Sequence, residues 1–518
     1  MLSYDELTSA ERELWDAFPE GCRVDLRTGA DESGAGDALA DDSVEGAHWQ
    51  PERTVRAAVV AMLLLGANGD QAGTVAALRL TGARITGRLD LSGAEVCHTV
   101  SLRYCRLDEA VSLRGATTRT VELTDSWTPG IDAELARVEG DLDLRRSTVE
   151  GGMLTVVGAH VAGNLLLTEA RIASAGEWAV LAGGLSVEGG LFGRRLTTRG
   201  GLRLPGAQLR NGLYLPAARL ENAGGVALAA GAVTASAVDC SEGFTAEGEV
   251  RFRRTRTEGP LTLAGARLNG TGIALDCVAM QVGELDYTPA APPEGTVDLR
   301  SARAAWCRDR DECWPEKVLL DGFTYDALRF EDSADAGDEG ATSARDAVAT
   351  PASDDVARRL AWLRRNPGYA PQPYEQLAAW YRRIGHDDHA RRVLLAKQRH
   401  RRRTLPLPQR AWGHLLDLTV GYGYRPWLAG VWLLVLTLLG TESFATRSPT
   451  PSNPGEGAPF HPLVYTLDLL IPIGGLGQRT AWYWPDGALQ WLAYLLIAMG
   501  WVLTTAVVAG VTRTLQKS

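Results

Sequence analysis

The sequence predicts a mainly β fold, namely a right-handed β-solenoid with a helical N-terminal cap, a small α-helical unit and C-terminal transmembrane helices. One phrase, close to L-x-L-x-G-A-x-[LIV]-x-G, recurs along residues 75–330. Apolar and polar residues alternate with period two inside each phrase, which is typical of strands and not of helices. Two segments after residue 425 carry no charge over most of their length.

The repeat in residues 75–330 predicts the solenoid. Examples are LRLTGARITG, LDLSGAEV, LTVVGAHVAG and LTLAGARLNG. Each alternating run is too short to bury a core as a hairpin, whereas short strands can stack coil on coil. Two phrases of about 11 to 12 residues make one coil of about 22–24 residues, so the region holds roughly 11 coils. Glycine closes most phrases because it adopts a positive φ at the corner without steric cost.

Residues 1–74 are expected to form a helical cap, because an open solenoid end exposes apolar coil and unpaired strand edges. Thr8 and Glu11 have the spacing of a capping box before a first helix. A second helix is expected over 53–65, where the apolar run is too short to cross a bilayer. The first residues have no basic region followed by an apolar one, so no signal peptide is expected.

Two further regions separate the solenoid from the C-terminal end. Residues 331–355 are acidic and rich in Ser, Ala and Gly, which predicts a flexible linker. Residues 356–407 have helical periodicity and resemble a single tetratricopeptide repeat with a polybasic end. We interpret this unit as a packing and spacing element, with a peptide-binding groove as the alternative.

Residues 408–518 are expected to form a membrane domain. Spans are predicted at about 425–441 and 488–511, and the apolar segment 461–477 is broken by Asp468, Pro472 and glycines, as in an interfacial or re-entrant segment. A basic block precedes the first span and predicts a multi-pass protein of the cytoplasmic membrane, with two spans and with the solenoid and C-terminus in the cytoplasm. It also predicts contact with the anionic lipids of the inner membrane. The residues expected at that surface are Lys397, Arg399, Arg401, Arg402, Arg403 and Arg410.

Motifs for catalysis, cofactors and metals are missing from the sequence, so no catalytic, cofactor-binding or metal-binding residue is assigned. Neither GxGxxG after a strand nor GxxxxGK[ST] occurs, so the sequence predicts neither of the usual nucleotide-phosphate-binding loops. The net charge of -10 argues against a nucleic-acid partner. Seven scattered cysteines favour a reducing compartment, and Cys307 and Cys313 lack the spacing of a zinc site. His386 and His389 have too few neighbouring ligands for a metal.

Two motifs of the sequence allow an enzymatic or a channel interpretation. Six aspartates occupy the middle of apolar-x-apolar triplets and should point outward, where a stack of carboxylates could cleave polysaccharides. Arginines occupy equivalent positions, however, and mixed signs indicate a solvated face. Residues 419–423 read TVGYG, the sequence of a potassium-channel filter, but they precede the first span, so we interpret them as a turn. The aspartates are Asp90, Asp143, Asp239, Asp276, Asp286 and Asp298.

Three stretches of the sequence carry a resemblance to a known family. They are GARITGRLDLSGAEV, the block from 373 to 403, and the run from GYGYRPW to GWVLTTAVVAGVTR. Together they resemble an actinobacterial family of membrane-associated, pentapeptide-repeat-like β-solenoids, whose members are often labelled membrane-associated oxidoreductases or left uncharacterised. The longer step of this repeat departs from the step of five that defines true pentapeptide repeats.

The expected function is that of a membrane-tethered scaffold without enzymatic activity, which binds a protein partner or itself through the solenoid. The first alternative is a membrane-associated oxidoreductase with a cofactor site that no motif reveals. The second alternative is a channel or transport component that uses the C-terminal hairpin.

Overall fold

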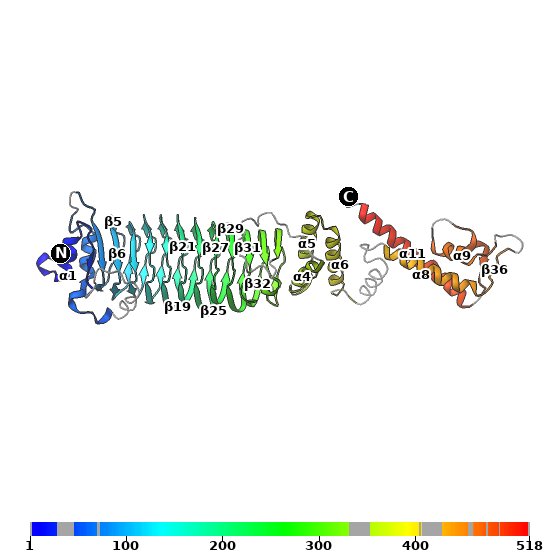
Figure 1. Ribbon diagram of the computed structural model, residues 1–518, viewed down its shortest axis with the longest axis horizontal. Helices are drawn as coiled ribbons and strands as arrows, with labels where there is room; N and C mark the ends of the chain where they lie inside the picture. Colours follow the sequence, from blue (N-terminus) through cyan, green and yellow to red (C-terminus); the bar gives the residue numbers. More distant parts are fainter. Residues whose placement is uncertain are drawn as a thin grey trace. The chain divides into compact units, whose positions relative to one another are not determined.

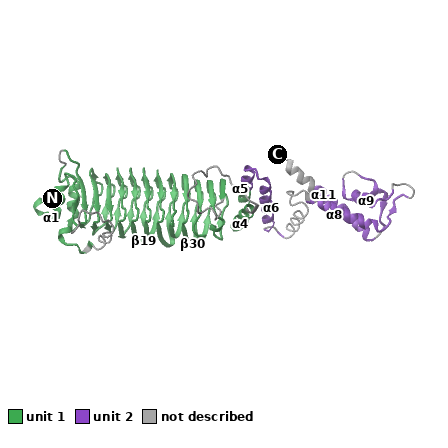
Figure 2. Cartoon of the chain, in the orientation of Figure 1, with its two compact units in different colours: residues 1–376 green, residues 377–518 purple. Residues whose placement is uncertain are grey.

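The computed structural model describes residues 3–27, 46–69, 73–330, 353–403, 406, 427–453, 459–472, 475–485 and 487–515. The chain divides into two units, Met1–Gln376 and Leu377–Ser518, which are coloured separately in Figure 2. The linker predicted at 331–355 lies almost wholly outside the described residues, as do the TVGYG sequence at 419–423 and Arg410.

The first unit is a β-solenoid with two long parallel sheets, which confirms the prediction of a mainly β solenoid (Figure 1). Twelve strands from β3 to β35 stack in one ladder of the larger sheet, where roughly 11 coils were expected. That ladder runs through β1 (Val24–Asp25), β3 (Ala77–Thr81), β6 (Thr99–Arg103), β10 (Val121–Thr124), β14 (Leu142–Asp143), β18 (Leu165–Leu166), β21 (Gly190–Phe192), β24 (Gly212–Tyr214), β27 (Val238–Asp239), β29 (Arg256–Thr262), β31 (Gln281–Tyr287), β33 (Arg303–Asp309) and β35 (Thr324–Phe330).

Three more ladders complete the two sheets. The second ladder of the larger sheet joins the first at β29 and contains β5 (Glu95–Val96), β9 (Thr117–Thr118), β13 (Arg137–Val138), β17 (His160–Val161), β20 (Ser186–Val187), β23 (Gln208–Leu209) and β26 (Thr234–Ala235). The smaller sheet contains β2 (Thr54–Arg56), β4 (Arg84–Thr86), β7 (Arg106–Leu107), β11 (Trp127–Thr128), β15 (Thr148–Gly151), β19 (Arg171–Leu181), β22 (Thr197–Arg203), β25 (Arg219–Ala229), β28 (Thr245–Arg251), β30 (Arg267–Asp276), β32 (Glu294–Asp298) and β34 (Val318–Leu319). A side ladder of β8 (Val111–Ser112), β12 (Ile131–Asp132) and β16 (Leu154–Thr155) joins that sheet at β19.

The strand register shows that a coil consists of two sequence phrases but varies in length more than expected. A short coil pairs Val100 with Val121, whereas a longer one pairs Leu165 with Leu191. The longer coils contain β19, β25 and β30, where the register shifts as extra residues bulge from the corner. The shorter coils between them carry glycines at that corner, such as Gly248, where a side chain would collide with the neighbouring backbone.

The corners and the core follow the repeat. The glycine of the G-A step has a positive φ, as at Gly206 and Gly265, and the alanine after it is buried. Several coils place other residues in the same left-handed conformation, for example Arg146 and Ala232. Both apolar residues of each L-x-L triplet are buried and stack on those of the next coil, which forms a continuous core along the solenoid.

The N-terminal cap contains strands as well as the predicted helices. Strands β1 and β2 pair with β3 and β4, so the segment expected to be helical also extends both sheets by one strand. The Thr8–Glu11 capping box is present at the start of α1 (Ser9–Ala17), and α3 (Ala57–Leu64) buries its apolar face. Three single-turn helices complete this end: η1 (Tyr4–Glu6), η2 (Gly46–His48) and η3 (Pro51–Arg53).

A second cap, which the sequence did not predict, closes the other end of the solenoid. Helix α4 (Ser353–Arg364) and the start of α5 (Pro371–Arg383) belong to the first unit and serve as a lid on the last coils, next to η4 (Asp311–Cys313). Asn366 accepts the N–H of Leu320, and Gln372 bonds both the N–H of Gly322 and the carbonyl of Phe323. Side chains of the predicted packing and spacing element therefore satisfy backbone groups at the edge of the last coil.

The second unit contains the rest of α5, α6 (Asp387–Arg403) and a group of C-terminal helices. In the latter, α9 (Pro462–Leu470) packs against α8 (Trp427–Ala445) and α11 (Ala488–Leu515), around a core that includes Phe444, Tyr465 and Leu496. Side chains at Gly440 and Gly500 would collide with Thr466 and Leu470, so these glycines permit close helix packing. The short elements α10 (Gln478–Ala481), β36 (Thr450–Pro451) and β37 (Trp482–Tyr483) complete the group.

Of the two predicted spans, one coincides with a helix of sufficient length and apolar character. Among the described residues, α11 alone is long and apolar enough to cross a membrane, over Ala488–Thr505. The first predicted span corresponds to α8, in which the apolar stretch Gly430–Ala445 is shorter.

Candidate functional site

The basic residues predicted at the membrane surface lie on the last two turns of α6. Of the five described residues, Arg399, Arg401 and Arg403 are exposed, and Lys397 and Arg402 are half-buried. The turns of the helix that precede this basic end bury Ala390, Val393, Leu394 and Leu395. Cations are favourable at this end because the helix dipole is negative at its C-terminus.

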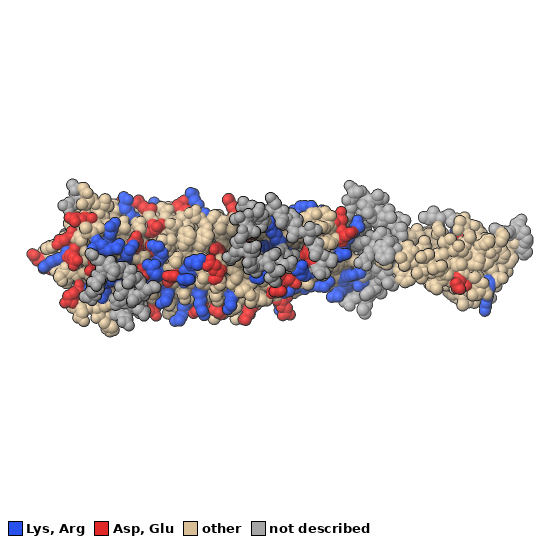
Figure 3. Space-filling view, viewed as in Figure 1, with Lys and Arg blue, Asp and Glu red and all other residues tan. Residues whose placement is uncertain are grey.

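The outer surface of the C-terminal helices is strongly apolar. Of the 19 large hydrophobic side chains that are exposed in the described residues, 13 lie between Val431 and Trp501. Leu438, Trp491 and Trp501 are exposed to 61%, 73% and 59%. Figure 3 shows the C-terminal helices with few charged atoms on the visible face, whereas the solenoid carries both signs. A soluble monomer seldom exposes an apolar surface of this kind.

A single carboxylate organises the broken apolar segment between α8 and α11. Asp468 is fully buried near the end of α9, and its two oxygens accept the backbone N–H groups of Leu476 and Arg479. These bonds fold the chain back after α9 and bring the start of α10 to the carboxylate. The predicted break in the segment is therefore present, and Asp468 stabilises it.

The outward aspartates of the solenoid do not form an acidic stripe. Asp143, Asp276, Asp286 and Asp298 are buried, although we expected a solvated face. Arg145, Arg253 and Arg300 pair with Asp143, Asp276 and Asp298, and each of these aspartates also accepts the backbone N–H two residues ahead. The neighbouring arginines cover the carboxylates, which act as structural turn residues.

Thiols and metal ligands show no catalytic grouping in the described residues. All seven cysteines are free, and only Cys22 and Cys97 are exposed. Burial raises the pKa of Cys105 to about 12 and raises that of Cys277 well above its usual value, which disfavours the reactive thiolate. His386 stacks on His389 at 5.2 Å between ring centres, and no group of three metal-binding residues exists in the described parts of the chain.

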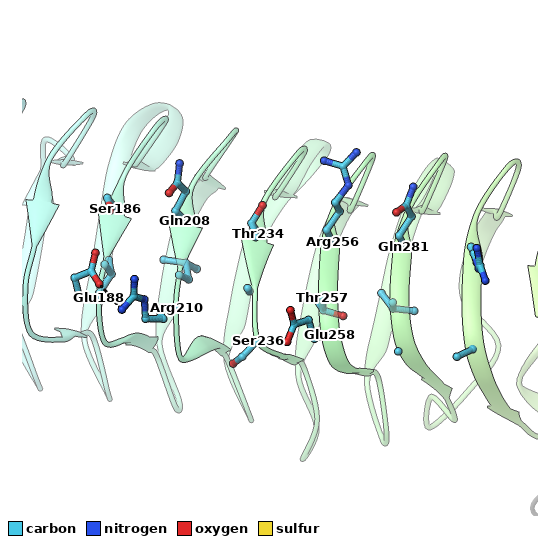
Figure 4. Close-up of a pocket in the computed structure, with 17 residues that line it drawn as sticks. Ser186, Glu188, Gln208, Arg210, Thr234, Ser236, Arg256, Thr257, Glu258 and Gln281 are labelled. Carbon is cyan, nitrogen blue, oxygen red and sulfur yellow. Dashed lines mark ion pairs between the residues drawn. The ribbon is translucent and has the colours of Figure 1, made fainter.

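A groove with a volume of about 730 Å³ crosses one face of the larger sheet, over β20, β23, β26, β29, β31 and β33 (Figure 4). Two rows of side chains line it, two residues apart on each strand, because alternate residues of a strand share a face. The first row is Ser186, Gln208, Thr234, Arg256, Gln281 and Arg303, and the second row is Glu188, Arg210, Ser236, Glu258, Gly283 and Ala305. The residues between the rows are buried in the core.

The charges of the groove are only partly paired. Arg210 and Glu188 of the second row form an ion pair at 3.2 Å. Arg256 and Arg303 of the first row are exposed and have no ion pair within the part of the chain that the structure describes. Sequence analysis missed this groove, because the coils vary in length and a constant step along the sequence does not show which strand-flanking residues become neighbours.

Comparison with known proteins gives no relative for this arrangement. No protein-family model, no curated protein and no solved structure matches the chain.

Proposed function

We propose that this protein is a scaffold that is tethered to the inner face of the cytoplasmic membrane and presents the solenoid groove to a protein partner. The observation that carries the proposal is the exposed apolar surface of α8, α9 and α11. Burying it in lipid removes an unfavourable contact with water, at about 25 cal/mol per Å² of apolar surface. The groove supplies the binding surface.

The tether consists of α11, which crosses the bilayer, and α8, which crosses with it as the shorter half of a hairpin. Helix α9 and the turn held by Asp468 then form the re-entrant or interfacial piece on the far side. Trp491 and Trp501, both exposed, are candidates for the interfacial belts. Two spans return both the solenoid and the C-terminus to the cytoplasm.

The basic end of α6 sets the orientation and adds affinity for anionic lipid. Its arginines precede the first span and should remain on the cytoplasmic side. Each basic residue near the surface contributes about 1 kcal/mol of attraction to an anionic leaflet. Arg399, Arg401, Arg402 and Arg403 therefore increase binding to anionic membranes beyond what the apolar helices provide.

Flotation of the purified chain with reconstituted vesicles tests the tether. We expect it to float with both neutral and anionic vesicles and to resist extraction by high salt. Changing Arg399, Arg401, Arg402 and Arg403 together to Gln should abolish the preference for anionic vesicles but not the flotation itself. A chain that stays soluble without detergent and does not float would contradict the tether.

Two measurements on the same preparation address the alternatives. A stoichiometric flavin or haem absorbance would favour the membrane-associated oxidoreductase. Ion flux across vesicles that contain the protein would favour the channel or transport component. The scaffold proposal predicts neither an absorbance signal nor ion flux.

A further inference from the structure

We infer that the groove binds an extended acidic segment of a partner protein, in which carboxylates recur at every third residue. This inference rests on the proposed scaffold function and specifies the chemistry of its partner. It depends on the two arginines of the first row, on their spacing along the solenoid, and on the side chains that face them.

Arg256 and Arg303 provide the cationic part of the groove. Three other arginines in these coils are used within the fold, since Arg253, Arg300 and Arg308 pair with aspartates of the same or the neighbouring coil. Arg256 and Arg303, in contrast, have no acidic partner among the described residues. Their guanidinium groups remain available for a carboxylate, which they can bind through two parallel hydrogen bonds.

The strand register sets the spacing of the two arginines. Arg256 pairs with Gln281, and Gln281 pairs with Arg303, so the two lie two strands apart in one row. Neighbouring strands are about 4.8 Å apart, which places the two backbone positions about 9.6 Å apart. One turn of a polyproline II helix contains three residues, covers about 9.3 Å and returns the side chain to the same face, whereas residues three apart on a β-strand point to opposite faces. Carboxylates three residues apart on a polyproline II peptide along the solenoid axis therefore match both arginines.

The second row favours a peptide over a polyanion such as nucleic acid. Glu188 and Glu258 lie in this row and would repel a chain that carries a phosphate at every step. A peptide presents backbone N–H groups between its acidic side chains, and these can donate to Glu258. Gln208 and Gln281 of the first row offer both donors and acceptors to its backbone. Gly283 and Ala305 leave the space in which the peptide lies beside Arg303.

Fluorescence anisotropy with labelled peptides and the full-length protein in detergent micelles tests the inference. The probe is a peptide of repeated Asp-Ala-Pro units, which favours an extended conformation and places a carboxylate at every third residue. The control has the same composition with its aspartates adjacent. We expect tighter binding of the probe than of the control, and weaker binding as salt is added.

Variants locate the site on the solenoid. Arg256→Gln and Arg303→Gln should each weaken the binding of the probe by about three- to tenfold, which is the range for partly exposed, charge-assisted contacts. Arg267→Gln is the matched control, because Arg267 is exposed on β30 of the other sheet and has no ion pair among the described residues. It should leave binding unchanged.

Several outcomes would overturn the inference. Equal affinity for the two peptides, or an equal loss in Arg267→Gln, would refute recognition by the groove. Binding that appears only after Asp332, Asp335 and Asp338 are changed to Ser would show that the chain's own acidic residues occupy the groove instead of a partner. Flotation of the same preparation separates the two proposals, since loss of peptide binding with intact flotation refutes only the groove, and the reverse refutes only the tether.

Discussion

The buried ion pair between Arg359 and Asp309 gives the sharpest test of how the solenoid end is held. Both side chains are 1% exposed, and the guanidinium makes two hydrogen bonds to the carboxylate at 2.7 and 2.8 Å. Trp314 donates a third hydrogen bond to Asp309 at 2.7 Å. Burial acts to lower the pKa of Arg359, but the charge and hydrogen bonds of Asp309 outweigh it and raise that pKa above its usual value. Arg359 is thus charged in the folded protein.

Arg359→Met should destabilise this end by about 3–5 kcal/mol, because it leaves the Asp309 carboxylate buried without its countercharge. At about 1.4 kcal/mol for each factor of ten, the opening constant of the last coils should rise by roughly 150- to 5,000-fold. Since each coil of a solenoid contacts only its neighbours, the effect should stay local. Hydrogen exchange measured by mass spectrometry should show lost protection in β33 and β35 and unchanged protection in β22 and β25.

Two controls make this prediction refutable. Arg364→Met removes an exposed arginine of the same helix and should change stability by no more than about 0.5 kcal/mol. Adding Asp309→Asn to Arg359→Met should recover part of the loss, because the unpaired charge is removed and Trp314 keeps an acceptor. Equal exchange in Arg359→Met and Arg364→Met, or a loss spread evenly along the solenoid, would show that the pair does not hold this end.

Three further predictions concern the corners, the N-terminal cap and the thiols. Gly206→Ala should destabilise the solenoid by about 1–2 kcal/mol in denaturant titrations, because Gly206 has a φ of +68° although the space around it is open. Gly272→Ala should have little effect, because Gly272 also lies in open space but has no positive φ. Burial alone would raise the pKa of Glu11, but hydrogen bonds from Arg56 and Thr8 outweigh it and hold that pKa below its usual value. The stability from Glu11 is therefore present above about pH 4.3 and lost as pH falls through its folded pKa, so Glu11→Gln should flatten the acid limb of thermal unfolding curves. Maleimide labelling at neutral pH should modify Cys22 and Cys97 in the native protein and all seven cysteines after denaturation, and rapid labelling of a third native thiol would contradict the burial.

The repeat sequence identifies which positions line the groove, but not which of them become neighbours. Each of its residues flanks a buried strand position that the repeat already identifies, as Arg256 and Glu258 flank Thr257. Which residues become neighbours depends on the coil lengths, and the coil from Thr117 to Arg137 is shorter than the one from Gln208 to Thr234. A constant step along the sequence therefore loses the register after a few coils, and the rows cannot be assembled from it.

Local periodicity alone specifies several parts of this protein. The alternation within each phrase and the glycine at its corner specify a stack of short parallel strands, and the capping box at Thr8 and the apolar run of α11 are equally local. The tertiary structure decides which charged side chains are buried in ion pairs and which remain available to a ligand, because the two members of several ion pairs lie one coil or more apart in the sequence. Asp276 is covered by Arg253 of the preceding coil, and Asp309 is held by Arg359, which follows much later in the chain. Arg256 and Arg303 remain without acidic partners in the described part of the chain for the same reason, since an ion pair requires proximity in space, which the register of the coils sets.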